Sequence, residues 1–374
     1  MRSQPSVALL IVLLLLTAGT VTGSFAEEPG PGLRLAWKHS FDGTIQGISA
    51  DSGADCFAVL TNRDLSVWTY AGELRWRRDF AALGRWFRAS KVAVAPSCDL
   101  AVVVGDSSYH YGWIFRRDGS RRHFATPGTP LAVAIAPAGD LIAVGTAAGR
   151  LSLVSPKGAS VATRKVEGIL NALEFSADGH LLVTDNIMGP GIYSQTGEPV
   201  WSAEGWWLST SADLAGKVSW RVPPHFSSLG QVTFYGPDGR EAWGRAVYNP
   251  EARISRDGTA VAIVGLLDEG GVDTGPAGGA PVEIAQNRLY IFDPAGAVKA
   301  SVPAPGQSLV GISENGRTLL LQDHRGMMRL YSEAGELRQE LQVCSQDGCP
   351  VLARRGLEHV LVTEGPFLQV FSGQ

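Results

Sequence analysis

The chain has 374 residues, 45% of them hydrophobic and 18% charged, with 32 Lys and Arg against 36 Asp and Glu. This length is enough for one large all-β domain or two ordinary domains, and 45 Gly with 21 Pro favour a fold rich in turns over a helical one. The formal charge of −4 and the lack of a basic stripe argue against a nucleic acid as partner.

The first predicted element is an export signal. Arg2 precedes an apolar run over residues 7–16, and Ser24-Phe25-Ala26 follows as a small-x-small cleavage site. This is the layout of a secretory signal peptide. We therefore expect residues 1–26 to be removed, residues 27–32 to form a short linker, and the protein to be periplasmic or secreted.

An uncleaved membrane anchor is the alternative, because residues 5–23 could nearly span a bilayer. The protein would then be membrane-anchored with an exported domain, and only in that case do we expect a contact with the membrane. No later segment of the sequence is long and apolar enough to predict a second span.

Four cysteines are expected to form disulfides in an oxidising compartment. Cys344 and Cys349 bracket four residues and predict a bridge that closes one loop, and Cys56 and Cys98 could form a second. A metal site is the alternative, but neither a Cys-x-x-Cys pair nor a His cluster accompanies them. No metal is predicted at the cysteines.

The rest of the chain is a repeat. The phrase GELRW at residues 72–76 returns as GEPVW at 197–201 and GREAW at 239–243. Equivalent glycines, each after a short β-type run, fall at positions 72, 119, 158, 197, 239, 296, 335 and 373. Recurrence at intervals of about 40 residues indicates a repeat architecture.

A second column of residues agrees with the glycines. Upstream of each glycine a short strand ends in a pair whose second member is small, and a tight polar turn and another apolar strand follow. These pairs are Ile48-Ser49, Val94-Ala95, Ile135-Ala136, Phe175-Ser176, Thr210-Ser211, Ile254-Ser255, Ile312-Ser313 and Leu352-Ala353. Each unit therefore has four antiparallel strands. The sequence predicts one all-β domain, an eight-bladed β-propeller over residues 33–374.

The Trp of the repeated phrase is assigned to packing. Trp76, Trp201 and Trp243 fall on the outermost strand, where a wide ring can cover the wedge that opens between blades. Counting four residues from each glycine gives other residue types in the remaining units, so Trp is preferred there rather than required. These residues are His123, Ala162, Ala300 and Gln339.

The last unit lacks its fourth strand, because the chain ends just after Gly373. Residues 33–40 follow a Gly and carry their own Trp37, as the outer strands do elsewhere. We therefore predict that residues 33–40 pair with the strand around residues 368–371 and close the ring, which removes the exposed sheet edges.

Two repeat families resemble these units. The segment VAIAPAGDLIAVGTAAGRLSLVSPKG resembles WD-type repeats, and the Gly-Glu-x-x-Trp endings resemble the repeats of pyrroloquinoline-quinone-like (PQQ-like) bacterial propellers. That resemblance implies an exported, eight-bladed member of a group that includes quinone-dependent dehydrogenases and non-enzymatic envelope assembly factors. The chain lacks the adjacent Cys-Cys pair of those dehydrogenases, so no quinone cofactor is predicted.

Connections in a propeller alternate between two faces, and here they differ in regularity. The turns after the first and third strands are short, whereas the opposite face carries long loops and links rich in aromatic residues and Arg. Loops of this kind on a rigid scaffold are where binding sites concentrate, and Trp, Tyr and Arg are the residues of interface hot spots. The candidates are Trp86, Arg88, Tyr109, His110, Tyr111, Trp206, Trp207, Trp220, Arg221, His225 and Phe226. Packing at the channel mouth is the alternative for each of them.

Two further groups of polar residues are candidates for chemistry. Glu174 and Arg253 replace residues that are mostly small at one position of the innermost strand, which makes them polar candidates for the central channel. The loop over residues 266–286 contains Asp268, Glu269 and Asp273 among glycines and could hold calcium. Its spacing matches no calcium-loop pattern, so a flap is favoured and no metal is predicted.

These observations favour binding over catalysis. The seven His are scattered and no nucleophile stands beside them in the sequence. We therefore expect a protein-interaction or assembly scaffold of the cell envelope, whose partner is another envelope or secreted protein. The alternative is a propeller enzyme, quinoprotein-like or other, that uses the central channel.

Overall fold

The computed structural model describes residues 32–50, 55–80, 88–106, 110–186, 188–221, 229–268, 287–344, 349–353 and 357–373. All of them belong to the unit Pro31–Gln374. The predicted signal peptide and the linker up to residue 31 lie outside the described residues. Within these ranges every regular element is a β-strand, and no helix has the length and apolar character to cross a membrane.

The strands pair in sequential groups of four, each antiparallel. The first three blades are β2 (Ile45–Ala50), β3 (Cys56–Thr61), β4 (Asp64–Thr69) and β5 (Leu74–Asp79); β6 (Arg88–Val94), β7 (Leu100–Asp106), β8 (Tyr111–Arg116) and β9 (Arg121–Ala125); and β10 (Pro130–Ile135), β11 (Ile142–Thr146), β12 (Arg150–Val154) and β13 (Ser160–Lys165). The fourth is β14 (Ala172–Phe175), β15 (Leu181–Asp185), β16 (Gly191–Tyr193) and β17 (Pro199–Ser202).

The fifth and sixth blades share one long strand. The fifth is β18 (Trp207–Thr210), β19 (Lys217–Arg221), β20 (Leu229–Tyr235) and the first half of β21 (Glu241–Ile254), whose second half begins the sixth with β22 (Val261–Leu267), β23 (Arg288–Phe292) and β24 (Val298–Pro303). The seventh is β25 (Gln307–Ile312), β26 (Thr318–Asp323), β27 (Met327–Ser332) and β28 (Leu337–Gln342), and the eighth is β29 (Val351–Ala353), β30 (His359–Glu364), β31 (Phe367–Gly373) and β1 (Leu33–Ser40). These groups match the predicted all-β propeller.

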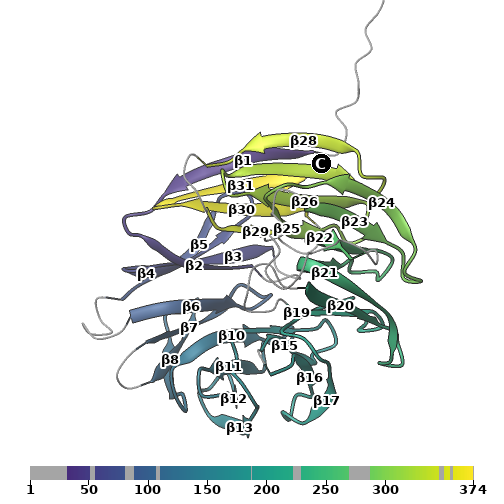
Figure 1. Ribbon diagram of the computed structural model, residues 1–374. Helices are drawn as coiled ribbons and strands as arrows, with labels where there is room; N and C mark the ends of the chain where they lie inside the picture. Colours follow the sequence, from purple (N-terminus) through teal and green to yellow (C-terminus); the bar gives the residue numbers. More distant parts are fainter. Residues whose placement is uncertain are drawn as a thin grey trace, which may run out of the picture. The chain divides into compact units, whose positions relative to one another are not determined.

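The N-terminal strand completes the last blade, as predicted (Figure 1). β1 runs antiparallel to β31 from the pair Leu33 and Gly373 to the pair Ser40 and Phe367. Gln339 of the seventh blade fastens the start of this strand: its Oε1 accepts the Leu33 N–H at 2.8 Å and its Nε2 donates to the Leu33 carbonyl at 2.9 Å. β1 is thus held by two blades.

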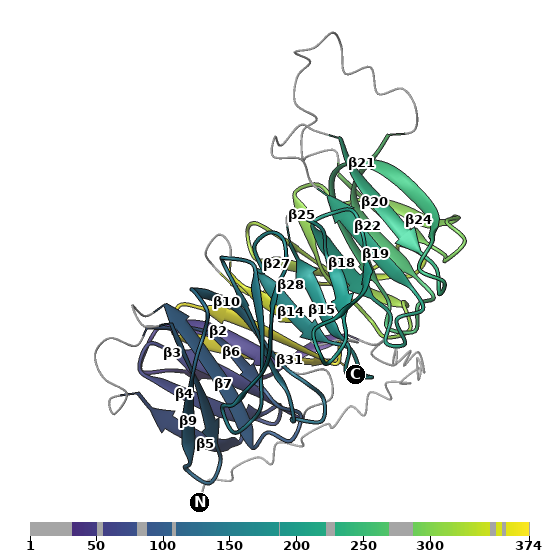
Figure 2. The same ribbon diagram turned by 90° about the horizontal axis from the view of Figure 1, so that it is seen from below.

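The core is divided among the junctions between blades. Along β3, Ala58 and Leu60 pack toward the second blade, while Phe57 and Val59 pack toward β30 and β31 of the eighth. This is the two-residue alternation of a strand with both faces buried. Other apolar clusters lie in the same way between each pair of successive blades, and Figure 2 shows the first blade beside the strands of the eighth.

The repeated glycine and Trp meet across these junctions, which confirms that the Trp column is for packing. Gly239 and Gly296, both at positive φ, lie against the rings of Trp201 and Trp243 of the preceding blade. Those indole N–H groups donate to the Gly239 and Pro294 carbonyls at 3.0 and 3.1 Å. A side chain at either glycine would meet the ring at 3.0 Å or less, so the turn of one blade fits the Trp of the preceding blade.

The second blade departs from the predicted column. In the first blade and in the third to seventh blades, a β-bulge follows the third turn. It places the residue four positions after the glycine opposite the third strand, as in the pair Val67 and Trp76. β8 and β9 pair without a bulge, so Ile114 lies opposite Arg122, and His123 lies opposite Trp113. The assignment of His123 to the column was therefore wrong by one residue, and Arg122 occupies it.

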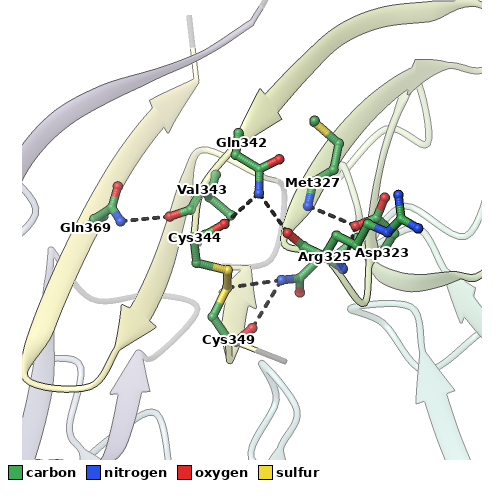
Figure 3. Close-up of a disulfide and its surroundings, with 9 residues drawn as sticks. Asp323, Arg325, Met327, Gln342, Val343, Cys344, Cys349 and Gln369 are labelled. Carbon is green, nitrogen blue, oxygen red and sulfur yellow. Dashed lines mark hydrogen bonds between the residues drawn. A yellow bond between two sulfur atoms is a disulfide. The ribbon is translucent and has the colours of Figure 1, made fainter. Parts of the chain in front are cut away.

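Both predicted disulfides are present. Cys56 and Cys98 join β3 of the first blade to the first turn of the second, with Cα atoms 6.1 Å apart. Cys344 and Cys349 close the link between β28 and β29 (Figure 3). The Gln322 amide donates to the Cys349 carbonyl at 3.1 Å. None of the described cysteines is free, so the metal alternative does not apply to them.

The first turns of four blades share one hydrogen bond, from a Ser hydroxyl to a carboxylate or amide oxygen two residues later. Hydrogen bonds from the Ser211 hydroxyl and the Ala215 N–H lower the pKa of Asp213. Burial would raise the pKa of Asp178 and Asp257, but hydrogen bonds within their turns outweigh it and the pKa of each is lowered. The folded state therefore favours the ionised form of these three aspartates.

Stability is expected to fall in acid for this reason. A lowered folded pKa stabilises the protein above the unfolded value of about 3.9, and that stability is lost as the pH falls through the folded pKa. Asp257→Asn keeps the acceptor oxygen, as Asn315 does 2.9 Å from the Ser313 hydroxyl. Urea unfolding from pH 7 downward should show a shallower acid loss for this variant; an unchanged slope would contradict the assignment.

Candidate functional site

One face gathers the loops after the second strands and the links between blades. Backbone hydrogen bonds join each link to its neighbouring loop: the Asn186 N–H donates to the Trp206 carbonyl at 2.8 Å and the Thr126 N–H to the His110 carbonyl at 2.6 Å. We call this the variable face. The first turns and third turns lie at the opposite ends of the same strands, on the regular face.

Three of the predicted Trp residues meet at the start of the fifth blade. Trp207 on β18 lies directly opposite Trp220 on β19, with their rings stacked 6.0 Å apart. The ring centres of Trp206 and Trp207 are 5.6 Å apart. The backbone N–H of Trp206 donates to the Trp220 carbonyl at 2.9 Å. Trp220 is 5% exposed, whereas Trp206 and Trp207 are half-buried. Trp220 is thus the packed base of the cluster, and the other two rings remain accessible.

Arg253 lies beside this cluster. Its guanidinium carbon is 5.1 Å from the centre of the Trp220 ring, and its Nη1 donates to the Ala252 carbonyl at 3.1 Å. Burial lowers the pKa of Arg253, and the nearby charge of Glu251 opposes that shift. No carboxylate of the described residues lies within 4 Å of the guanidinium. The site therefore holds a half-buried cation that has no ion pair with any residue of the described ranges.

Glu251 is the polar neighbour that sequence reasoning missed. Its carboxylate accepts the backbone N–H of Leu309 in the seventh blade at 2.6 Å, which fixes it across the junction. The sequence signal for Glu251 was weak. The register in which β21 pairs with β22 shifts between Tyr248 and Glu251, and this irregularity places Glu251 at the start of an inner strand.

The small residues at the Arg253 position have a steric reason. A Cβ added at Gly311 would lie 3.1 Å from the Ala353 Cβ in the next blade, and Ser209 uses its hydroxyl to accept the Ile254 N–H at 3.3 Å. The first strands of most successive blades contact each other, as β21 of the sixth blade contacts β25 of the seventh. Glu174, the other channel candidate, lies on β14 opposite Leu182 and is half-buried.

Other candidates lie elsewhere. Arg221 is exposed at the end of β19. His110 in the second blade has φ 52°, and its buried Nδ1 has no hydrogen-bond partner among the described residues. Tyr111 is 38% exposed and meets His123 edge-on at 5.7 Å. The structure does not bring these two rings into the Trp206 cluster through any described contact.

Several candidates lie outside the described residues: Trp86, Tyr109, His225 and Phe226, together with Glu269 and Asp273 of the calcium alternative. Arg88 is placed only by its backbone, as the first residue of β6. Asp268 is described, and its N–H donates to the Ala246 carbonyl at 3.0 Å. Within the described ranges no three His, Cys, Asp or Glu side chains gather in a way that could hold a metal.

A Ser, Asp and His that stand together are not a catalytic triad. The Ser176 hydroxyl donates to Asp178, and His180 Nδ1 is 3.0 Å from the other oxygen of the same carboxylate. A nucleophilic Ser would instead donate to the imidazole. Ser176 is 1% exposed, and the same Ser-to-carboxylate bond recurs in other first turns. The group therefore stabilises a turn.

Known structures with this arrangement are numerous. The propeller of Dos1 superposes with a TM-score of 0.63 at 11% identity, covering 91% of this chain and 95% of that one. BamB from Moraxella catarrhalis gives 0.61 at 14% identity, covering 91% and 98%. The fold is a β-propeller. Hydrazine synthase of Kuenenia stuttgartiensis gives 0.52 at 15% identity, covering 75% and 94%.

This likeness shows the fold alone, because all three identities are 15% or lower. No protein-family model matches the sequence, and no curated protein matches it either. The β-propeller part of the predicted resemblance is thus confirmed, while the PQQ-like and WD-type repeat labels stay predictions.

Proposed function

We propose that this protein is an exported β-propeller that binds another envelope or secreted protein through its variable face. The observation that carries the proposal is the pair of half-buried rings, Trp206 and Trp207, beside the guanidinium of Arg253, which has no ion pair with the described residues. Such rings contribute a large contact area with little loss of side-chain entropy. Two disulfides support an oxidising compartment.

The geometry defines what the partner should present. The open side of the Trp206 and Trp207 rings fits an apolar side chain, and Arg253 fits a carboxylate, because an arginine binds that group with two parallel hydrogen bonds. Arg221, exposed at the end of β19, adds a second cation near the rim of the site. The partner residue expected at the centre is therefore apolar with an acidic neighbour.

A photoreactive residue in place of Trp206 tests the proposal in the cells that make the protein. We expect one cross-linked protein from position 206 and none from position 315, because Asn315 is exposed on the regular face. Equal cross-linking from both positions would contradict a specific variable-face site.

Substitution of the same site provides a quantitative check. Trp206→Ala with Arg221→Ala should weaken the binding of the cross-linked partner about tenfold or more, while Lys299→Ala with Arg338→Ala should leave it unchanged. Both pairs of variants should keep the melting temperature of the wild type. Unchanged partner affinity in the first variant would overturn the proposed site.

Arg253 also favours a second function, small-molecule chemistry in the central channel. A half-buried guanidinium that has no carboxylate of the described residues within 4 Å is suited to an anionic ligand. That function predicts that Arg253→Gln abolishes binding of a co-purifying small molecule, detected by native mass spectrometry, and leaves cross-linking at position 206 intact. Loss of the cross-link alone would favour the scaffold.

A further inference from the structure

Charge is divided unevenly along the chain. Residues 45–165, which span the first three blades, contain 15 Lys and Arg against 9 Asp and Glu. Residues 166–374 contain 14 Lys and Arg against 24 Asp and Glu. The nearly balanced total therefore conceals a basic part and an acidic part.

The fold places many of these cations along one edge. Six of them lie on the outermost strands of the first three blades, in their third turns or at the end of a third strand, and we call them the basic rim: Arg75, Arg78, Arg116, Arg121, Arg122 and Lys157. Arg78 reaches from β5 to the second blade, where its Nη2 donates to the Arg116 and Arg117 carbonyls at 2.8 and 2.7 Å. Arg116 reaches the third blade, donating to the Pro156 carbonyl at 3.4 Å. The rim is continuous across both junctions.

Nearby acids neutralise other cations but leave the rim charged. Arg77 pairs with Asp64, Arg117 with Asp99 at 3.6 Å, and Arg164 with Glu198 of the fourth blade. No residue of the rim has an ion pair within 4 Å inside the described part of the chain. Asp118 lies in the third turn between Arg116 and Arg121. Hydrogen bonds from Ser120, whose N–H lies 2.8 Å from the carboxylate, lower the pKa of Asp118, and the charges of Arg116 and Arg78 add to that shift.

Apolar side chains are exposed on the same outer strands. Leu74 is 48% exposed next to Arg75 on β5, and Val161 is 55% exposed on β13. Cations interleaved with apolar groups along an outer edge match a surface that carries anionic headgroups over acyl chains. The aromatic centre of a protein-binding site lies instead on the variable face.

We propose that the basic rim binds the surface of a bilayer that contains anionic phospholipid. The charge of the rim attracts phosphate headgroups, and Leu74 and Val161 enter the interface between them. Each Lys or Arg near such a surface strengthens binding about fivefold. This inference does not depend on the partner proposed for the variable face, and it places a membrane contact in the folded propeller rather than only in an N-terminal anchor.

Sedimentation of the full chain with lipid vesicles tests the proposal. We compare vesicles of phosphatidylcholine mixed with phosphatidylglycerol with vesicles of phosphatidylcholine alone, each at low and high salt. The wild type should sediment with the anionic vesicles at low salt, much less at high salt because salt screens the attraction, and little with the neutral vesicles.

Charge reversal locates the surface. Arg75→Glu, Arg121→Glu and Lys157→Glu together should weaken binding to anionic vesicles by at least tenfold. The matched control is Lys299→Glu, Arg317→Glu and Arg338→Glu on exposed positions of the sixth and seventh blades, which changes the net charge equally. Both variants retain the same N-terminal segment, so any binding by that segment contributes equally to the two.

Either of two results would overturn the proposal: equal binding of the wild type to anionic and neutral vesicles, or equal loss in the two variants. The first result would indicate that the rim binds an acidic protein instead of a bilayer, and the same charge reversal should then weaken the binding of that protein. Thermal melting of both variants shows whether a loss of binding comes from unfolding. The cross-linking experiment at position 206 is independent of either outcome.

Discussion

A chain that begins at residue 41 is expected to lose its cooperative fold. Without β1, the edge of β31 has no partner for its backbone groups, and the apolar cluster between the eighth and first blades loses Trp37. The loss is comparable with the whole free energy of unfolding of a typical domain, about 5–15 kcal/mol. Size-exclusion chromatography should show aggregate in place of monomer, because unpaired strand edges associate.

A point substitution keeps this prediction testable when the truncated chain does not fold. Trp37 stacks with Phe57 at 6.0 Å and donates its indole N–H to the Tyr70 carbonyl at 2.8 Å. Trp37→Ala should lower the free energy of unfolding by about 3 kcal/mol, which is about 4 °C in melting temperature for a domain of this length.

The control for this substitution lies on the same strand. Leu35 is 52% exposed, so Leu35→Ala should change stability by less than about 0.5 kcal/mol. A synthetic peptide of residues 32–42 should also restore monomer to the truncated chain. Equal effects of the two substitutions, or a truncated chain that melts like the wild type, would contradict closure by β1.

Loss of the Cys56–Cys98 disulfide is expected to destabilise the protein more than loss of Cys344–Cys349. The first spans 42 residues and the second only 5. In the chain-entropy account, the longer loop corresponds to about 4 kcal/mol of stability and the shorter to about 2 kcal/mol. The longer bridge also joins two blades, beside the Trp76 indole that donates to the Cys98 carbonyl at 2.7 Å.

Replacing each pair of cysteines by Ala separates the two contributions. The wild type and the two double variants are unfolded in urea under oxidising conditions. The loss of stability in each variant is then measured as a shift of the unfolding midpoint at constant slope. Reductant should destabilise the wild type and have little effect on a chain that lacks all four cysteines. A larger loss for the 344–349 pair would show that unfolded-chain entropy does not govern these bridges.

Local rules explain why the sequence predicted the fold so fully. A Gly at positive φ, a Ser and an Asp in a tight turn, and the two-residue alternation of buried strands depend only on neighbours along the chain. Repetition of these signals in successive units made the strand order readable, and the unpaired last unit pointed to β1. The bridge between Cys344 and Cys349 followed from their short spacing, whereas an even number of cysteines in a chain predicted to be exported left the pairing of Cys56 with Cys98 open until the structure showed it.

The site was predicted only as a face. The sequence placed Trp206, Trp207 and Trp220 among many aromatic candidates, but their stacking and the approach of Arg253 depend on strand register and on which blades adjoin. The missing bulge in the second blade shows the same limit, because it moved Arg122 into the place assigned to His123.

The sequence by itself thus determined the repeat, the strands, the closure and the bridge between Cys344 and Cys349, because each is encoded in short patterns or in their count. Only the tertiary structure decided which side chains from different blades come together. The approach of Arg253 to the Trp cluster and the basic rim from β5 to the third blade both arise from contacts between residues about 33 to 40 positions apart. Such contacts are set by the packing of one blade on the next, which no local pattern specifies.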